Sequence, residues 1–202
     1  MSDVVIVKYN AGNIRSVSCA LHRLGVDPVV SDDPKVLGNA KRVIFPGVGE
    51  ASTAMEYLRK THLDEVLLSL TQPFLGICLG MQLMCSLSEE NQTTCLGMYD
   101  LTVTRFKKEE QLKIPHMGWN TLACSTDPLF AGVHDNPWVY FVHSYYVPSS
   151  FHTIASCTYG STTFSAALGK DNFRGVQFHP EKSGPFGSAI LQNFLQIKED
   201  AL

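Results

Sequence analysis

The sequence lacks the patterns that would assign it at once to a metalloprotein or a membrane protein. Its six cysteines include no C-x-x-C pair, and its seven histidines include no H-x-x-x-H pair, although metal sites commonly use such spacings. No apolar run approaches the roughly 18 residues that a membrane-spanning helix needs. We therefore expect no metal site and no contact with a membrane.

Charge of one sign is also scarce. The 202 residues carry a net charge of −3, and the basic residues are scattered along the chain. This weak, mixed charge gives no electrostatic reason to expect binding to nucleic acid. The first nine residues, MSDVVIVKY, place an acid where a secretory signal carries basic residues. We therefore expect a cytoplasmic protein whose cysteines form no disulfide framework.

What the first half does have is a regular hydrophobic periodicity. Its first apolar segment is nearly continuous and β-branched, as in a strand buried on both faces. Ile14, Val17, Leu21 and Leu24 then fall on one stripe of a helix. Strands are expected at Val4–Tyr9, Val29–Val30, Arg42–Phe45 and Phe74–Ile77, and helices at 13–24, Ser52–Lys60, Leu63–Leu70 and from Met81 towards Leu87.

Helix signals become rare after about residue 95. Because strands and helices alternate before that point, we predict an α/β fold: an open, mostly parallel central sheet flanked by helices, with antiparallel strands added in the second half. A single domain over residues 1–202 is expected. The later strands are expected at Leu101–Phe106, Trp138–Val142, Thr153–Cys157, Ser165–Ala167 and Gly175–Phe178, and a final helix at Gly187–Lys198.

One cysteine stands in a setting that a core cysteine does not need. The pentapeptide Gly76-Ile77-Cys78-Leu79-Gly80 fits G-x-nucleophile-x-G, a sharp strand-to-helix turn in which a Cβ at either glycine would collide with the neighbouring element. The turn places Cys78 at a helix N-terminus, which favours the thiolate, and aims the N–H of Leu79 at a developing oxyanion. The structural alternative is a buried cysteine beside two packing glycines.

A thiolate nucleophile needs a base, and the base needs a group that orients it. His179 follows an apolar strand run, and Pro180 favours extended backbone in the residue before it. Glu181 can then share a face with His179 and fix its tautomer. Another histidine with a neighbouring carboxylate is His134, beside Asp135. The alternative to a catalytic role is an ordinary strand end exposed to solvent.

Together, GICLGMQ and FHPE resemble the class I, triad-type glutamine amidotransferases. The resemblance implies that Cys78 attacks the side-chain amide of glutamine. It further implies that His179 carries the proton to the leaving ammonia and that Glu181 orients His179. The glutamyl thioester is then hydrolysed to glutamate. No metal or organic cofactor is implied.

Further stretches resemble one branch of that family, the glutaminase subunits of imidazole glycerol phosphate synthases. The likeness extends over essentially the whole chain, although many members have glycine where this sequence has Asn10. It implies a heterodimer with a (β/α)8-barrel cyclase that uses the ammonia to make imidazole glycerol phosphate and aminoimidazole carboxamide ribotide in histidine biosynthesis. The chain ends 21 residues after FHPE, so we expect a free-standing subunit. The stretches are YNAGNI, FPGVG, KIPHMGWN and YFVHSY, beginning at Tyr9, Phe45, Lys113 and Tyr140.

The same resemblance implies roles for residues outside the triad. Backbone groups of the oxyanion hole are expected at Gly47, Val48 and Leu79. Contacts to the substrate glutamine are expected at Gly49, Gln82, Ser144 and Tyr145. Contacts to the protein partner are expected at Asn13, Trp119, Asn120, Tyr140 and Lys182.

Several alternatives remain open at this point. The loop from Gly47 nearly matches the dinucleotide pattern G-x-G-x-x-G, but its third glycine is missing and it follows the third strand, not the first. A paralogous subunit that supplies ammonia for a surface-polysaccharide sugar would keep the same chemistry. Further alternatives are a freely active thiol hydrolase and a non-catalytic activating subunit. On residue type alone, Trp119 could be a core residue and Gln82 an ordinary surface residue.

Overall fold

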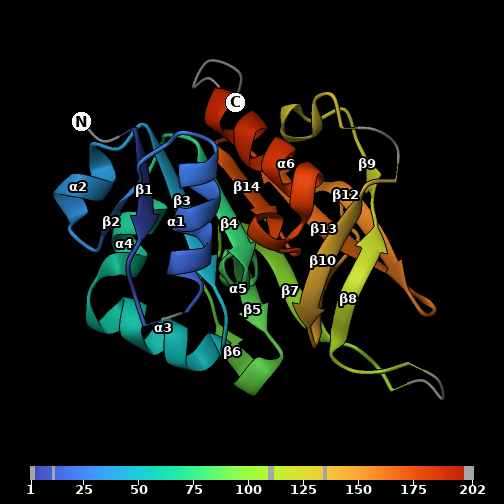
Figure 1. Cartoon of the computed structure of the whole chain (residues 1–202). Helices are drawn as coiled ribbons and strands as arrows, with labels where there is room; N and C mark the ends of the chain where they lie inside the picture. Colours follow the sequence, from blue (N-terminus) through green and yellow to red (C-terminus); the bar gives the residue numbers. More distant parts are fainter. Residues whose placement is uncertain (1–2, 11, 109–111, 134–135, 198–202) are drawn as a thin grey trace.

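The computed structural model describes residues 3–10, 12–108, 112–133 and 136–197. The expected His134–Asp135 pair and the end of the last expected helix lie outside these residues. A large mixed sheet forms the centre of the molecule (Figure 1). Its strands, in spatial order, are β2 (Val29–Ser31), β1 (Val4–Val7), β3 (Arg42–Gly47), β4 (Phe74–Cys78), β14 (Phe173–Val176), β13 (Thr162–Lys170), β11 (Tyr145–Pro148), β7 (Tyr99–Arg105), β5 (Cys85–Ser88) and β6 (Thr93–Thr94).

Strand direction first changes at β13. From β2 to β14 every neighbouring pair is parallel, whereas β13 runs antiparallel to both β14 and β11. The predicted fold class, a mostly parallel sheet with antiparallel strands added in the second half, is therefore confirmed. Two further strands, β12 (Thr153–Tyr159) and β9 (Ala123–Cys124), extend the sheet beyond β13.

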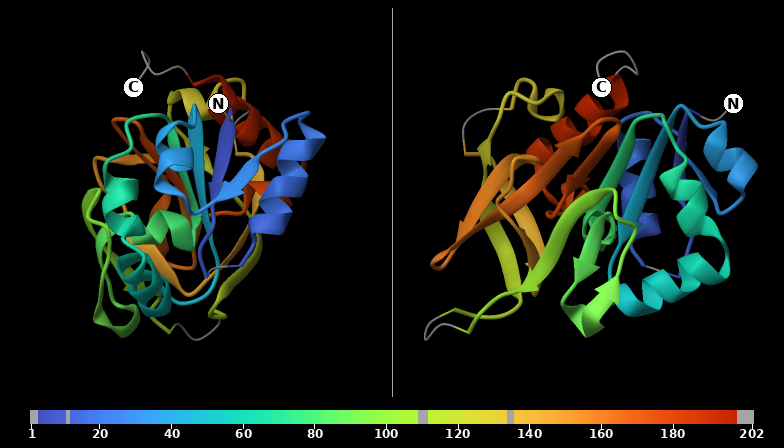
Figure 2. Two further views of the ribbon diagram at one scale, coloured as in Figure 1. Left: turned by 90° about the vertical axis from the view of Figure 1, so that its left-hand side faces the viewer. Right: turned by 180° about the vertical axis from the view of Figure 1, so that it is seen from behind.

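Helices cover both faces of the parallel part. Successive side chains of a strand point to opposite faces, and in β1 both sets are apolar. Val5 and Val7 pack towards α2, α3 and α4, whereas Val4 and Ile6 pack towards α1 and α6. Figure 2 shows this sandwich on edge, with α1 and α6 on one side and α3 and α4 on the other. The helices are α1 (Ile14–Arg23), α2 (Pro34–Gly38), α3 (Ala51–Lys60), α4 (Leu63–Leu68), α5 (Leu79–Leu83) and α6 (Gly184–Gln196), with short 3₁₀ turns η1 (Glu90–Gln92), η2 (Pro128–Phe130) and η3 (Pro180–Lys182).

A second, two-stranded sheet stands beside the first. Strands β8 (His116–Thr121) and β10 (Trp138–His143) pair antiparallel, with Trp119 opposite Tyr140 and His116 opposite His143. We call this pair the β8–β10 ribbon. It has an inner face that packs on the core through Val139 and Phe141, and an outer face. The sequence predicted β10 but not its partner β8.

One expected helix is wrong. The segment from Met81 towards Leu87 is predicted as a helix, but α5 begins earlier, directly after Cys78, and ends at Leu83. The next residues form β5, which pairs in parallel with β7 and places Ser88 opposite Val103. Pairing with a strand formed later in the sequence outweighs the weak local helix preference of this segment.

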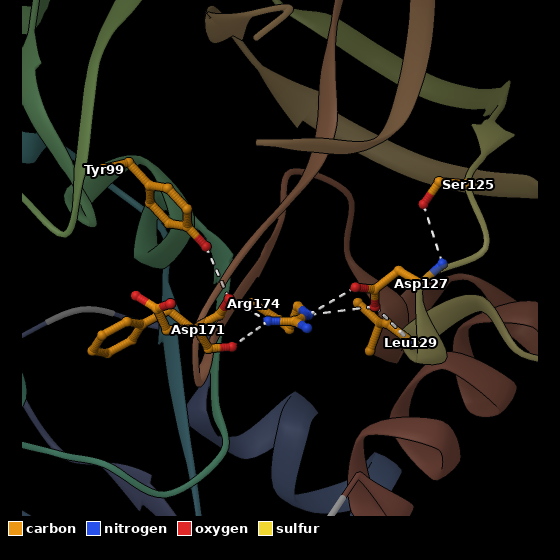
Figure 3. A network of polar contacts seen from close by, with 7 residues as sticks. Tyr99, Ser125, Asp127, Leu129, Asp171 and Arg174 are labelled. Carbon is orange, nitrogen blue, oxygen red and sulfur yellow. Dashed lines mark hydrogen bonds and ion pairs between the residues drawn. The ribbon is translucent and has the colours of Figure 1, made fainter. Parts of the chain in front are cut away.

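A buried ion pair ties the β9–η2 segment to β14. Nε of Arg174 lies 3.1 Å from Oδ2 of Asp127, and Nη1 donates to the carbonyl oxygens of Asp171 and Phe173. Both charged side chains are about nine-tenths buried. Figure 3 shows that the network continues on each side, through Tyr99 to the Phe173 carbonyl and through the Asp127 carboxylate to the N–H of Leu129. Each of the two buried charges thus has the other as a partner and also a hydrogen bond to the backbone.

Candidate active site

Cys78 sits at the predicted sharp turn between β4 and α5. Its backbone has φ 54° and ψ −110°, a conformation that costs an L-residue free energy and that the flanking elements must impose. A Cβ on Gly80 would overlap the carbonyl oxygen of Phe45, and a Cβ on Gly76 would lie 2.9 Å from the backbone nitrogen of Met81. The predicted collision at both glycines is therefore confirmed, and the turn is built by close packing.

His179 and Glu181 lie next to this turn because β14 pairs in parallel with β4. Val176 is in register with Ile77, so the chain leaving β14 passes beside the chain leaving β4. Nδ1 of His179 lies 2.8 Å from Oε1 of Glu181, and both side chains are fully buried. The structure thus brings together the three residues of the predicted triad. Their catalytic roles stay a prediction.

The electrostatics of this pair favour a charged imidazole. Burial lowers the pKa of His179, but interaction with Cys78 and then with Glu181 outweighs it, so the pKa of His179 is raised overall. Burial likewise raises the pKa of Glu181, but the contacts with His179 and Asn13 hold it below its usual range. Both shifts favour an imidazolium between a carboxylate and the Cys78 sulfur.

Two atoms of the triad have unused hydrogen-bonding capacity. Among the described residues, Nε2 of His179 and Oε2 of Glu181 are buried without a hydrogen-bond partner. Buried polar atoms are usually satisfied, so such exceptions call for a functional explanation. Since Nδ1 of His179 is held by Glu181, Nε2 is the nitrogen left for the sulfur and the substrate.

Asn13 has a contact that the sequence did not suggest. Its Nδ2 donates to Oε1 of Glu181 at 2.8 Å and lies 3.4 Å from Nδ1 of His179. The residue adopts φ 83° at the start of α1, which directs the half-buried side chain back to the triad. Its predicted place in a partner interface is untested, but it supports Glu181 directly.

A cavity of about 330 Å³ opens onto Cys78. A volume of this size is at the small end of ligand sites and suits a single amino acid. Predicted substrate and oxyanion residues gather in its wall: Val48, Gly49, Leu79, Gln82, Ser144 and Tyr145.

Gly47 is placed by β3, which runs two residues further than predicted. The extra residues, Pro46 and Gly47, pair with β4, and Gly47 lies in register with Cys78. A Cβ at Gly47 would lie 3.0 Å from the Leu79 side chain and even closer to the Tyr9 hydroxyl, which donates to the Pro46 carbonyl. This close packing explains the glycine. The oxyanion role of Gly47, Val48 and Leu79 stays a prediction.

Gln177 is a site residue that sequence reasoning missed. Its buried Nε2 lies 3.7 Å from the Cys78 sulfur, and its Oε1 accepts a hydrogen bond from Nε2 of Gln82 at 2.9 Å. Gln82 is itself buried, so it is not an ordinary surface residue. The available signal was spacing, because Gln177 stands two residues before His179 on an extended segment.

Glu90 is a second missed residue. It lines the cavity from η1 and accepts the N–H of Ala51 at 2.8 Å. Burial raises the pKa of Glu90, an effect that the Ala51 N–H opposes and the nearby Glu50 reinforces. A carboxylate in this wall can pair with an ammonium group of a ligand. Its segment was predicted neither as helix nor as strand, so no pattern marked it.

The outer face of the β8–β10 ribbon is apolar and exposed. The Trp119 and Trp138 side chains are 52% and 55% exposed, so the alternative of a core tryptophan at position 119 is wrong. The Trp119 and Tyr140 rings lie 6.2 Å apart, and the ammonium of Lys182 lies 5.8 Å from the Tyr140 ring. Asn120 points the other way, because neighbouring residues of a strand face opposite sides. The expected contacts of Trp119 and Asn120 with the partner stay predictions.

No group of three or more metal-ligating side chains is clustered within the described ranges. None of the helices described there has the length and apolarity of a membrane span.

Comparison with known proteins shows the family of the chain. The family model of class-I glutamine amidotransferases matches residues 6–197. The chain therefore belongs to the class-I glutamine amidotransferase family.

Curated relatives identify a branch of the family. The chain is 56% identical to the imidazole glycerol phosphate synthase subunit HisH of Bacteroides fragilis, covering 96% of this chain and 99% of the relative. It is 47% identical to the HisH subunit of Shewanella sediminis, covering 100% and 94%. A solved structure of a glutamine amidotransferase from Thermotoga maritima has a TM-score of 0.62 at 18% identity, covering 100% of this chain and 88% of that one. At that identity the solved structure supports the fold alone.

Proposed function

We propose that this chain hydrolyses L-glutamine to glutamate and ammonia and passes the ammonia to a (β/α)8-barrel cyclase in histidine biosynthesis. One observation carries the proposal: Cys78 stands on a strained turn beside a buried His179–Glu181 pair, at the mouth of an amino-acid-sized cavity. The names of the HisH relatives support the assignment to histidine biosynthesis and not to sugar amidation.

The first half of the reaction forms a thioester. The Cys78 thiolate attacks the side-chain amide carbon of glutamine, and the carbonyl electrons move onto oxygen. Backbone N–H groups near Leu79 and Val48 stabilise that oxyanion. Nε2 of His179 then gives its proton to the amide nitrogen, the C–N bond breaks, and ammonia leaves.

The second half releases glutamate. A water molecule attacks the thioester carbon while the now neutral His179 accepts its proton. The C–S bond breaks, the thiolate returns, and His179 is again an imidazolium. Glu181 stays ionised throughout, and it fixes the ring with Nε2 towards the sulfur. Glu90 pairs with the α-ammonium of the substrate at the other end of the cavity.

The partner subunit docks on the outer face of the β8–β10 ribbon. The supporting observation is the exposed apolar surface of Met117, Trp119 and Trp138, which lies beside the Tyr140–Lys182 contact. Exposed aromatic clusters of this kind are typical of interfaces. Lys182 directly follows the triad glutamate, so this surface adjoins the site where ammonia is released.

The test uses the chain reconstituted with a barrel cyclase of the histidine pathway. A Cys78→Ala variant is expected to abolish glutamine-dependent synthesis of imidazole glycerol phosphate while ammonium-dependent synthesis persists. Synthesis from glutamine by the variant would refute the catalytic assignment. Transfer of ammonia to a sugar acceptor only would refute the pathway, and rapid glutamine hydrolysis without a partner would identify a freely active hydrolase.

A further inference from the structure

Two buried histidines outside the triad lie on the inner face of the β8–β10 ribbon, on the side of the cavity. His116 on β8 and His143 on β10 face inward, directly opposite each other. Nδ1 of His116 lies 3.0 Å from Nε2 of His143, and Nδ1 of His143 lies 2.7 Å from the carbonyl oxygen of Tyr145. Tyr145 and His143 both line the cavity.

The proton on each ring can be assigned from its partners. A carbonyl only accepts, so Nδ1 of His143 must donate to Tyr145. Burial lowers the pKa of His143 to about 3 and that of His116 to about 4, so both rings are neutral at pH 7. Nε2 of His143 is therefore an acceptor, and Nδ1–H of His116 donates to it. Nε2 of His116 is left to accept from Nδ2 of Asn120, 3.5 Å away.

Asn120 is oriented independently of the histidines. Its Nδ2 donates to the carbonyl of Thr158 at 2.9 Å, and its Oδ1 accepts the N–H of Thr121 at 2.8 Å. The His116 ring is also fixed, since it stacks on Tyr159 with ring centroids 3.9 Å apart. Hydrogen-bond donation therefore runs in one direction, from Asn120 through both histidines to the Tyr145 carbonyl.

The same carbonyl is tied to the nucleophile. Nε2 of Gln82 donates to the Tyr145 oxygen at 2.9 Å, so this oxygen accepts from both Gln82 and His143. Gln82 also donates to Gln177, whose amide nitrogen approaches the Cys78 sulfur. A continuous chain of contacts thus joins the inner face of the ribbon to the reacting atom, and the ribbon's outer face is the surface proposed above for the partner.

We propose that His116 and His143 are positioning residues that hold the Tyr145 carbonyl, and through it Gln82 and Gln177, in the geometry that glutamine binding requires at Cys78. The inference rests on the proposed glutaminase function. The histidines touch no reacting atom. They act through one fixed pair of tautomers, in which each ring carries its proton on Nδ1, and a shift of β8 against β10 would break the chain at the contact between the two rings.

The first test is independent of activity. Nitrogen-15 NMR of the full chain, with the histidines assigned by His116→Gln and His143→Asn, should show both rings as neutral Nδ1–H tautomers from about pH 5.5 to 8. His116 and then His179 are the titratable groups that lower the pKa of His143, and neither ring of the pair forms an ion pair within the described residues. An Nε2–H tautomer, or titration of either ring near pH 6.5, would overturn the proposal.

The second test separates the donor from the ring. In the cyclase complex, His116→Asn keeps an N–H near the position of Nδ1, whereas His116→Gln keeps one only near Nε2. We expect His116→Gln to raise the KM for glutamine about tenfold, the effect of leaving one buried acceptor unpaired, and His116→Asn to raise it much less. Ammonium-dependent synthesis should be unchanged in both, and exposed His22→Gln is the matched control.

Three results would separate the claims. If both variants are folded, equal KM values for His116→Gln and His116→Asn would refute the positioning role. Failure of the unmodified complex to hydrolyse glutamine would refute the proposed function, while the NMR test would still decide the tautomers. A raised KM in His22→Gln of the same size would show a general effect of histidine loss and would overturn the inference.

Discussion

β14 carries one buried ion pair near its start and leads into another just beyond its end, and the two differ in how fully they are satisfied. At Arg174–Asp127 the carboxylate meets the guanidinium and a backbone N–H, and the guanidinium also reaches two carbonyls (Figure 3). At His179–Glu181 each partner keeps one buried atom without a hydrogen bond. The comparison teaches that a fully satisfied pair serves stability, whereas an incompletely satisfied one leaves capacity for a substrate.

Replacing the nucleophile should give the largest effect and should leave the fold intact. Cys78→Ser is nearly isosteric, but its hydroxyl is not ionised by His179, so we expect glutaminase activity in the complex to fall on the order of 10⁴-fold or more. The free energy of unfolding should change by less than about 1 kcal/mol. Glutamine turnover and denaturant titration measure the two quantities. A large loss of stability would contradict the expectation that Cys78 serves the reaction and not the fold.

The opposite result is expected at the other pair. Asp127→Ala leaves a buried guanidinium without its carboxylate, so the free energy of unfolding should fall by about 3–5 kcal/mol. Turnover per folded molecule should stay unchanged, because no atom of this pair reaches the cavity. The double variant Asp127→Leu/Arg174→Met should regain much of the lost stability, and a further loss instead would show that the charges themselves stabilise the fold.

The sharp turn at Cys78 affects both stability and activity, because close packing there holds the nucleophile in place. Gly80→Ala forces a Cβ into the Phe45 carbonyl, so we expect a loss of about 1–3 kcal/mol in unfolding free energy together with a loss of turnover. Gly38→Ala on α2 is the matched control, because a Cβ there meets nothing within 4 Å. Equal stability of the two variants would contradict the packing account of the turn.

The smallest expected effect is a shift in pH dependence. The pKa of His179 is raised in the folded chain, so the interaction with Glu181 stabilises the fold fully below the ordinary pKa of about 6.5 and is lost as the pH rises through the folded value. Glu181→Gln removes one cause of that shift. The basic limb of kcat/KM for glutamine should therefore move to lower pH by about one unit. An unmoved limb would mean that Glu181 does not set the charge of His179.

Much of this arrangement could be predicted from the sequence because local patterns encode it. The glycines around Cys78 indicate close packing, and the alternation of strands and helices implies parallel pairing in the first half of the chain. The parallel pairing of β14 with β4 was not predicted, because the later strands were expected to be antiparallel. Long-range contacts could not be predicted in this way. The strand that begins at Cys85 forms only against β7, and β8 only against β10.

Side-chain direction was the other part that sequence could not supply. Asn13 is in contact with Glu181 because of a left-handed backbone, and Asn120 faces inward because Trp119 faces outward. Gln177 reaches the Cys78 sulfur, and Glu90 reaches the cavity, from elements distant in sequence. Such contacts depend on where two segments meet, which no motif of either segment records.

The most direct test of the central claim is to map the covalent intermediate. The complex with its cyclase, quenched in acid during turnover of radiolabelled glutamine, should carry the label as a thioester on the peptide that contains Cys78. The other cysteines are internal controls, two of them exposed, at positions 19 and 124. Label on Cys78 alone is the predicted result, and label on another cysteine, or turnover with no thioester in a variant lacking Cys78, would contradict the account.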